Sequence, residues 1–233
     1  IGALILIPLA LRSGSLRVPR SSIKYIVLYA IFEMFIPWTL ISDGQRSVSS
    51  GLAGLLIATV PIWANLLAAL AGDHSVRHPR QAIGIAVGFI GVLLLVGIDS
   101  LMESHDLVAM LKILFSAFSY AFATFMAARH LNGVAGVSVN GWAMALTAVV
   151  FFIPAVQTAP TSMPSYQALL ALLALGLLCT ALAFYLFFTL LRMIGPPKAS
   201  TVTYPNTAIA IALGVLLLNE PITVGMALGF PMV

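Results

Sequence analysis

The sequence is dominated by apolar runs of about twenty residues that are separated by short polar loops. A helix rises 1.5 Å per residue, so a run of roughly 20 residues crosses the ~30 Å hydrocarbon core of a bilayer. Full spans are predicted at 22–41, 48–71, 81–98, 107–130, 137–156, 165–193 and 199–218. The loops between them leave no room for a soluble domain. The pattern predicts an all-α integral membrane protein.

Two shorter apolar runs lie at the ends of the sequence. Residues 1–11 are too few to cross a bilayer, and we interpret them as the tail of a span. Residues 222–233 are interpreted as the first half of a ninth span. We therefore expect a bundle of about nine transmembrane segments that is cut at both ends.

Composition supports this class of protein. Hydrophobic residues make up 61% of the chain and charged residues only 8%, against about 25% charged residues in a soluble domain. Most basic residues fall in loops, so the net charge of +4 indicates orientation and not nucleic-acid binding. The single cysteine, Cys179, excludes an internal disulfide. His74 and His78 lack a third ligand, so neither a metal site nor a cofactor is expected.

The basic residues also predict a topology. The loops that follow the first, third, fifth and seventh spans hold nine of the eleven Lys and Arg residues, and the opposite side holds Arg46 and Lys112. Cytoplasmic loops carry the excess of Lys and Arg in membrane proteins. The expected location is therefore the plasma (inner) membrane, with those four loops in the cytoplasm. The nine residues are Arg12, Arg17, Arg20, Lys24, Arg77, Arg80, Arg129, Arg192 and Lys198.

An internal repeat links the two halves of the chain. IGIAVGF at 83–89 recurs as VGMALGF at 224–230, and each copy follows a span that contains a proline, Pro61 or Pro205. Both prolines are expected to break a helix, because proline lacks the N–H that a helix requires. Units with an odd number of spans insert in opposite directions. Inverted repeats with interrupted helices are typical of secondary transporters.

The stretch 199–221 combines this proline with small and hydroxylated residues. On a helix they form one stripe, which either packs against a neighbouring helix or lines a substrate path. The stripe consists of Ser200, Thr203, Thr207, Ala210 and Gly214. Glu220, just before Pro221, is interpreted as the start of the following helix.

These segments resemble the drug/metabolite transporter superfamily, in particular its EamA-domain members. The similarity lies in 49–70, in 195–223 with its terminal Asn219-Glu220, and in Ser119-Tyr120-Ala121. It implies a ten-helix fold of two EamA units that exports or exchanges small metabolites. Residues 1–98 would be the first EamA-like repeat, without its first helix and part of the second, and 107–233 the second repeat, with its last helix incomplete. The second-repeat proline stands at 205, where the family pattern places it at Thr207.

Glu33 is the strongest candidate for a functional side chain. It lies about 11 residues into its span, near the middle of the membrane. An ionisable group at that depth is costly and by default a functional candidate. It would suit a proton-coupled cycle. The alternatives are a neutral structural carboxyl or a pair with Lys112.

Further polar and aromatic residues are candidates for the substrate pathway, each with packing or membrane anchoring as the alternative. They are Trp38, Asn65, Ser119, Tyr120, Tyr185, Thr203, Tyr204, Asn206 and Thr207. No cluster of cations lies inside a span, which disfavours phosphorylated substrates.

The function predicted from the sequence is secondary active transport by alternating access, as an exporter or exchanger. The substrate is expected to be a small neutral, zwitterionic or cationic metabolite. The expected partners are that substrate, the lipid bilayer, a proton or other coupling ion and a second copy of the chain, with no nucleic acid. The alternatives are a membrane-embedded sensor or an enzyme, but the chain offers no clustered catalytic groups and is not expected to be an enzyme.

Overall fold

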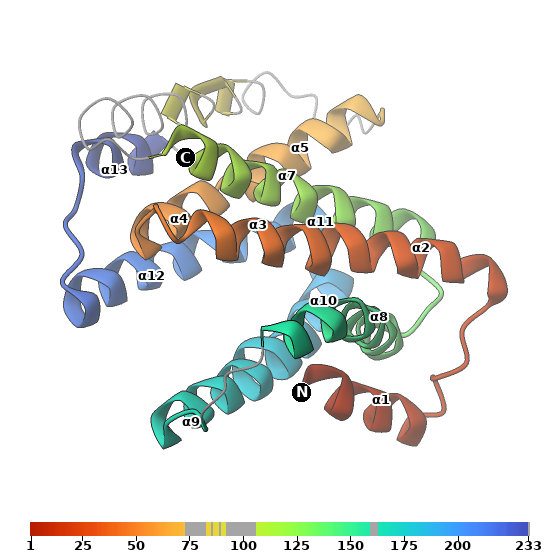
Figure 1. Ribbon diagram of the computed structural model, residues 1–233. Coiled ribbons are helices and arrows are strands. Elements are labelled where there is room, and N and C mark those ends of the chain that lie inside the picture. Colours follow the sequence, from red (N-terminus) through yellow and green to blue (C-terminus); the bar gives the residue numbers. More distant parts are fainter. Residues whose placement is uncertain (73–82, 85, 89, 92–105, 159–162, 233) are drawn as a thin grey trace. The chain divides into compact units, whose positions relative to one another are not determined.

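The computed structural model describes residues 1–72, 83–84, 86–88, 90–91, 106–158 and 163–232. The secondary structure assigned in these ranges is helical throughout (Figure 1). The helices of the first half are α1 (Gly2–Arg12), α2 (Arg20–Ala30), the π-helix η1 (Ile31–Phe35), α3 (Ile36–Gly44), α4 (Ser50–Ile57) and α5 (Val60–Leu70). Those of the second half are α7 (Leu107–His130), α8 (Gly136–Gln157), α9 (Tyr166–Ala174), η3 (Leu175–Leu182), α10 (Ala183–Ile194), α11 (Pro196–Ala199), η4 (Ser200–Val202), α12 (Thr203–Leu218), α13 (Val224–Gly229) and η5 (Phe230–Met232).

The helices agree with the predicted spans. Within the described ranges, five continuous helical segments are long and apolar enough to cross a membrane. They are Arg20–Gly44, Ser50–Leu70, Leu107–His130, Gly136–Gln157 and Tyr166–Ile194. Helices α1 and α12 are apolar but shorter. The predicted all-α membrane bundle is thus confirmed. The span predicted at 81–98 lies mostly outside the described residues.

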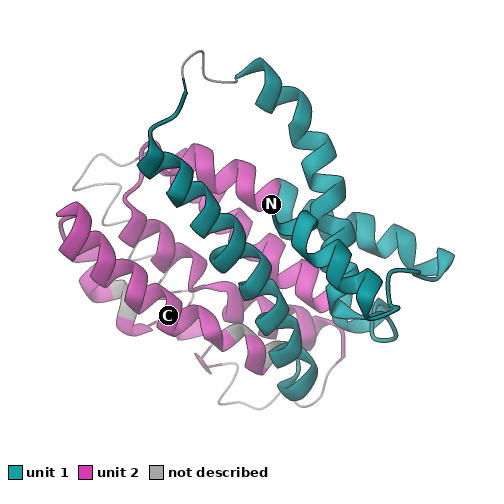
Figure 2. Ribbon diagram, turned by 90° about the horizontal axis from the view of Figure 1, so that it is seen from below, with its two compact units in different colours: residues 1–35, 126–195 teal, residues 36–125, 196–233 magenta. Residues whose placement is uncertain are grey.

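The chain divides into two compact units (Figure 2). Unit 1 comprises Ile1–Phe35 and Met126–Gly195, and unit 2 comprises Ile36–Phe125 and Pro196–Val233. Each unit therefore contains residues from both halves of the sequence. The repeat boundaries at 1–98 and 107–233 remain a prediction.

Unit 1 is assembled on α8, against which α1, α2 and α10 pack. Glycines allow the close approach: a Cβ on Gly136 would stand 2.3 Å from the Phe188 ring, and one on Gly141 would stand 3.4 Å from Ile7. Small residues of this kind let helices approach in membranes, where no hydrophobic effect drives them together. Much of α9, η3 and α10 exposes large apolar side chains, as lipid-facing helices do.

Unit 2 has two small apolar clusters. The first joins α4, α7 and α13 through residues that include Leu52, Ile113 and Met226. The second joins α5 to α7 through Val60, Ala64, Ala117 and Ala121. Helix α12 packs along α4.

Prolines explain where several helices change geometry. Pro37 has no N–H to donate to the Glu33 carbonyl four residues earlier. In a π-helix, each carbonyl accepts from the N–H five residues later instead of four. The π-helix η1 lies at this point in the chain. Pro61 is the second residue of α5, which begins just after α4 ends at Ile57. Pro205 is the third residue of α12, where its missing N–H costs no helical bond.

Candidate functional site

Glu33 lies at the centre of the π-helix η1 in unit 1. Its side chain is only 5% exposed, and its Oε2 atom has no hydrogen-bond partner among the described residues. A buried polar atom without a partner costs about 1–3 kcal/mol. The carboxyl group is therefore not a fully hydrogen-bonded structural group. The π-helix is the kind of local irregularity that often occurs at functional sites.

Ser119 in unit 2 has the same property. Its side chain is fully buried in α7, and its Oγ has no hydrogen-bond partner in the described part of the chain. One turn earlier, the Ser116 hydroxyl donates to the carbonyl of Lys112 at 2.9 Å. Ser119 does not form the equivalent bond, so it retains its capacity to bind another polar group.

Several other predicted site residues lie on elements that pack around α5. Tyr120 of α7 contacts the apolar cluster between α5 and α7. Asn65 of α5 donates to the carbonyl of Pro61 at 2.8 Å, within its own helix. This bond is local to α5, where the sequence indicated a bond between helices. Helix α5 also packs against α11 and η4, which lead into Thr203.

The small-residue stripe of α12 packs against α4. The Thr207 hydroxyl is 2.9 Å from the carbonyl of Gly54 and 2.8 Å from that of Thr203, and Thr207 is 1% exposed. A Cβ on Gly54 would stand 3.2 Å from the Cβ of Ala210. This part of the stripe therefore packs closely against α4, and a role in lining a substrate path stays a prediction. Close packing of this kind requires small residues.

The other predicted pathway residues are less buried than Thr207 and Ser119. Tyr204 and Trp38 are partly buried, and Asn206 is exposed. Tyr185 in unit 1 is 47% exposed on α10. Tyr185 belongs to the same unit as Glu33, and the other three belong to the same unit as Ser119.

Glu220 has a different role from the one that its sequence context indicated. Helix α13 begins only at Val224, so Glu220 does not start it. Its Oε1 accepts from the backbone N–H of Ser50 at 3.0 Å and from the Ser50 hydroxyl, and its Oε2 accepts from the N–H of Gly51 at 3.0 Å. Glu220 thus caps the N-terminus of α4 from a position 170 residues away. The absence of an acidic residue in the first turn of α4 was the one sequence signal for such a cap.

The carboxylate of Glu220 lies beyond the end of α12, outside the membrane-spanning segments. Burial acts to raise its pKa, while the bonds from Ser50 and Gly51 lower it. The net effect is a pKa below the usual value of 4.5. The bonds therefore favour the charged form, as expected for an anion at a helix N-terminus.

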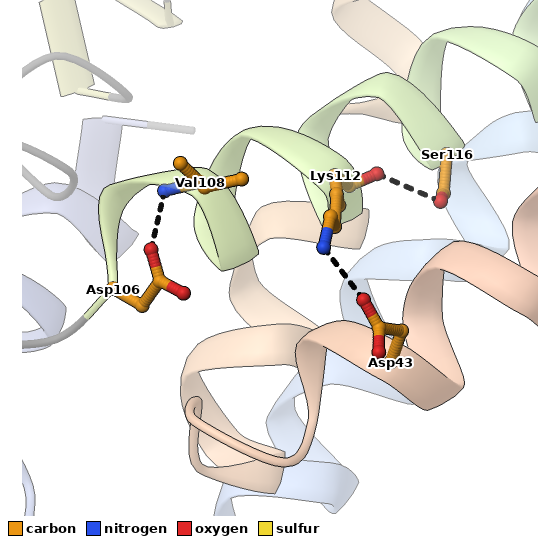
Figure 3. Close-up of polar contacts among 5 residues, drawn as sticks. All are labelled: Asp43, Asp106, Val108, Lys112 and Ser116. Carbon is orange, nitrogen blue, oxygen red and sulfur yellow. Dashed lines mark hydrogen bonds and ion pairs between the residues drawn. The ribbon is translucent and has the colours of Figure 1, made fainter.

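Lys112 forms an ion pair with Asp43 and not the proposed pair with Glu33. Its Nζ lies 2.6 Å from Oδ2 of Asp43 (Figure 3). The two side chains are 36% and 45% exposed, so the pair contributes little to stability. Nearby, Oδ1 of Asp106 accepts from the N–H of Val108 at 2.9 Å in the first turn of α7.

These features define a class of protein. The described chain consists of apolar helices long enough to cross a bilayer, with isolated buried polar groups in their interiors. It contains no group of three or more His, Cys, Asp or Glu residues that could hold a metal ion within the ranges described. The protein is a multi-pass integral membrane protein.

The sequence identifies the family. It matches the EamA-like transporter family over residues 1–97 and 107–233, and the chain belongs to this family. The protein is a membrane transporter, and its resemblance to EamA-domain proteins is confirmed.

Known relatives are also transporters by name. The chain is 24% identical over 224 residues to the uncharacterized transporter YoaV of Bacillus subtilis (strain 168), with 95% of this chain and 76% of YoaV covered. It is 27% identical over 181 residues to the uncharacterized inner membrane transporter YedA of Escherichia coli (strain K12), covering 77% of this chain and 58% of YedA.

One solved crystal structure has the same fold. It superposes with a TM-score of 0.70 at 19% identity, covering 99% of this chain and 80% of the other.

Proposed function

We propose that the protein is a secondary active transporter that exports or exchanges a small metabolite by alternating access. Family membership and the names of the relatives support transport itself. The sequence contains no GxxxxGK[ST] loop for nucleotide phosphates, so energy would come from an ion or solute gradient. Inverted repeats would supply the two states, as in other secondary transporters. The loops after the first, third, fifth and seventh spans would face the cytoplasm.

The proposed substrate is neutral, zwitterionic or cationic. Lys112 is the one cation that lies more than two residues inside a predicted span, and its charge is matched by Asp43. A phosphorylated substrate would require cations that are free to bind it. Hydroxyl, amide and carboxyl groups such as those of Ser119, Asn65 and Glu33 suit amines, amino acids and similar metabolites.

Glu33 is the residue that we propose for energy coupling. The observation that carries this proposal is a carboxyl group buried near mid-membrane with an oxygen that no described residue satisfies. Such a group is costly unless it binds a proton or a cation. It would take up the ion on one side and release it on the other.

Transport is tested with everted membrane vesicles that contain the full-length protein. Uptake of radiolabelled amino acids, amines and nucleosides is compared with uptake into vesicles that lack the protein. Saturable uptake of at least one compound, dependent on an ion gradient, is expected. Uptake equal to that of empty vesicles for every class would contradict the proposal.

The role of Glu33 is tested once a substrate is known. Substrate-driven proton movement is followed with a pH-sensitive dye inside the vesicles for wild type, Glu33→Gln and Glu33→Asp. We expect Glu33→Gln to abolish proton movement and Glu33→Asp to retain part of it. Asp106→Asn, which removes an exposed carboxylate, is the matched control. Proton movement that persists in Glu33→Gln would exclude Glu33 as the coupling group.

A further inference from the structure

Unit 1 carries all six of its Lys and Arg residues at exposed positions near helix ends. We call this group the basic end of unit 1. It consists of Arg12, Arg17, Arg20, Lys24, Arg129 and Arg192. They come from three separate parts of the sequence: the connection from α1 to α2, the end of α7 and the end of α10.

Hydrogen bonds hold these three parts together. The Ser138 hydroxyl at the start of α8 lies 2.7 Å from the carbonyl of Ser15, and Trp142 Nε1 donates to the carbonyl of Leu16 at 3.1 Å. These bonds fix the α1–α2 connection against the start of α8. Arg192 donates to the carbonyl of Val134 at 2.7 Å, in the connection from α7 to α8. The cations therefore lie at one end of the unit.

Aromatic rings contribute to the same end. The rings of Tyr25 and His130 stack with centroids 4.2 Å apart, which joins the start of α2 to the end of α7. Lys24 Nζ lies 4.8 Å from the centroid of the Tyr25 ring. Trp142, Tyr25 and the cations form the combination of residues that is typical of a membrane–water interface.

The unit has no carboxylate to balance these charges. Glu33 is the only acidic residue in the sequence of unit 1, and it is buried within a span. The sequence from 130 to 191 contains no Lys, Arg, Asp or Glu, so the opposite ends of α8 and α10 are uncharged. The basic residues of unit 1 are thus concentrated at one end, where the sequence of the unit has no acidic residue.

We propose that the basic end of unit 1 is a binding surface for the headgroups of anionic phospholipids. Guanidinium groups bind phosphate oxygens through paired hydrogen bonds, and cations near an anionic leaflet are attracted to its surface. Orientation by the positive-inside rule would place this end at the anionic cytoplasmic leaflet. The proposal concerns lipid binding and does not depend on transport.

The test uses Trp142 as a reporter because its indole donates to the same connection that carries Arg17. Trp38→Phe and Trp63→Phe leave it as the only tryptophan. The full-length protein is reconstituted into vesicles of phosphatidylcholine with a minor fraction of phosphatidylglycerol, one of the two lipids being brominated to quench fluorescence. Both leaflets have the same composition, so the result does not depend on the orientation of the protein.

We expect brominated phosphatidylglycerol to quench Trp142 well beyond its share of the lipid. In Arg17→Gln/Arg20→Gln/Lys24→Gln, the relative association constant should fall by on the order of a hundredfold, at about fivefold per cation. Salt at ~1 M should weaken the preference by screening. Arg17→Lys/Arg20→Lys/Lys24→Arg retains the charge and should retain the preference. Arg46→Gln, in unit 2, should leave it unchanged.

Three results would overturn the proposal. Equal quenching by the two brominated lipids would show that the surface does not select anionic headgroups. An unchanged preference in the triple Gln variant would show that other groups select them. Loss of the preference on addition of millimolar inorganic phosphate would show that the surface binds free phosphate instead of lipid.

Discussion

Glu220 and Ser50 join the end of α12 to the start of α4. The backbone N–H and the hydroxyl of Ser50 both donate to Oε1 of Glu220, and the next N–H, of Gly51, donates to Oε2. The third N–H of the helix, of Leu52, donates to the Ser49 hydroxyl at 3.2 Å. The free N–H groups of the first turn are thus satisfied.

The turn after α12 directs the Glu220 carboxylate toward α4. Asn219 has φ 54° and ψ 34°, a left-handed conformation that Asn tolerates better than most residues. The N–H of Glu220 then donates to the carbonyl of Gly214 at 3.1 Å, which closes the helix end. The chain reverses, and the Glu220 side chain reaches α4.

Replacing the charge should weaken this junction. In Glu220→Gln, one amide oxygen replaces two carboxylate oxygens, and the attraction to the helix N-terminus is lost. We expect a loss of about 1–2 kcal/mol in stability. The measurement is thermal unfolding in detergent. Asp106→Asn, which affects a cap within a single turn of α7, is the control and should cause a smaller loss; equal losses would contradict the special role of Glu220.

The same carboxylate predicts a dependence on pH. The pKa of Glu220 is lowered in the folded protein from its ordinary value of 4.5. The contribution of Glu220 to the stability of the fold is therefore complete above about pH 4.5. It is lost as the pH falls through the pKa of the folded state, because the carboxyl group of the unfolded chain is protonated at a higher pH. Melting temperatures recorded from pH 7 to pH 3 should fall more steeply for wild type than for Glu220→Gln. Parallel curves would rule out this contribution.

Gly214 should not tolerate a side chain. A Cβ there would stand 2.6 Å from Oε2 of Glu220, so Gly214→Ala must displace the carboxylate. Any gain from the better helix propensity of alanine should be outweighed, with a net loss of about 1–3 kcal/mol. Gly133→Ala, in a turn where no atom lies within 4 Å of the added Cβ, is the control for an added methyl group without a clash. Unfolding measurements that show Gly214→Ala to be as stable as Gly133→Ala would refute the predicted clash.

A disulfide can test the contact between α4 and α12 in the membrane. The Cβ atoms at positions 54 and 210 would stand 3.2 Å apart, close to the ~3.5–4.5 Å of natural disulfides. Cys179 is the only native cysteine, so Gly54→Cys/Ala210→Cys is made in a Cys179→Ser background. Mild oxidation should form an intramolecular bond, seen as a reducible shift on a denaturing gel. Neither Gly54→Cys nor Ala210→Cys alone should give this shift. Failure of the pair to form a bond would contradict the packing.

Local sequence was sufficient for the helices and for some of their breaks. Predicted boundaries such as 107–130 and 165–193 fall within a residue or two of Leu107–His130 and Tyr166–Ile194. The reason is that an apolar run must bond its own backbone in lipid, which makes helix formation a local property. The position of Glu33 well inside an apolar span was also evident from the sequence.

Partners across the sequence were decided only by the tertiary structure. Lys112 pairs with Asp43 across 69 residues, Thr207 bonds Gly54 across 153, and Glu220 caps Ser50 across 170. A sequence pattern gives the depth of a side chain in its span but not the helix that lies opposite. The apolar runs thus determined a helical membrane bundle, while packing between helices decided which polar groups are satisfied and which remain available to bind an ion or a substrate.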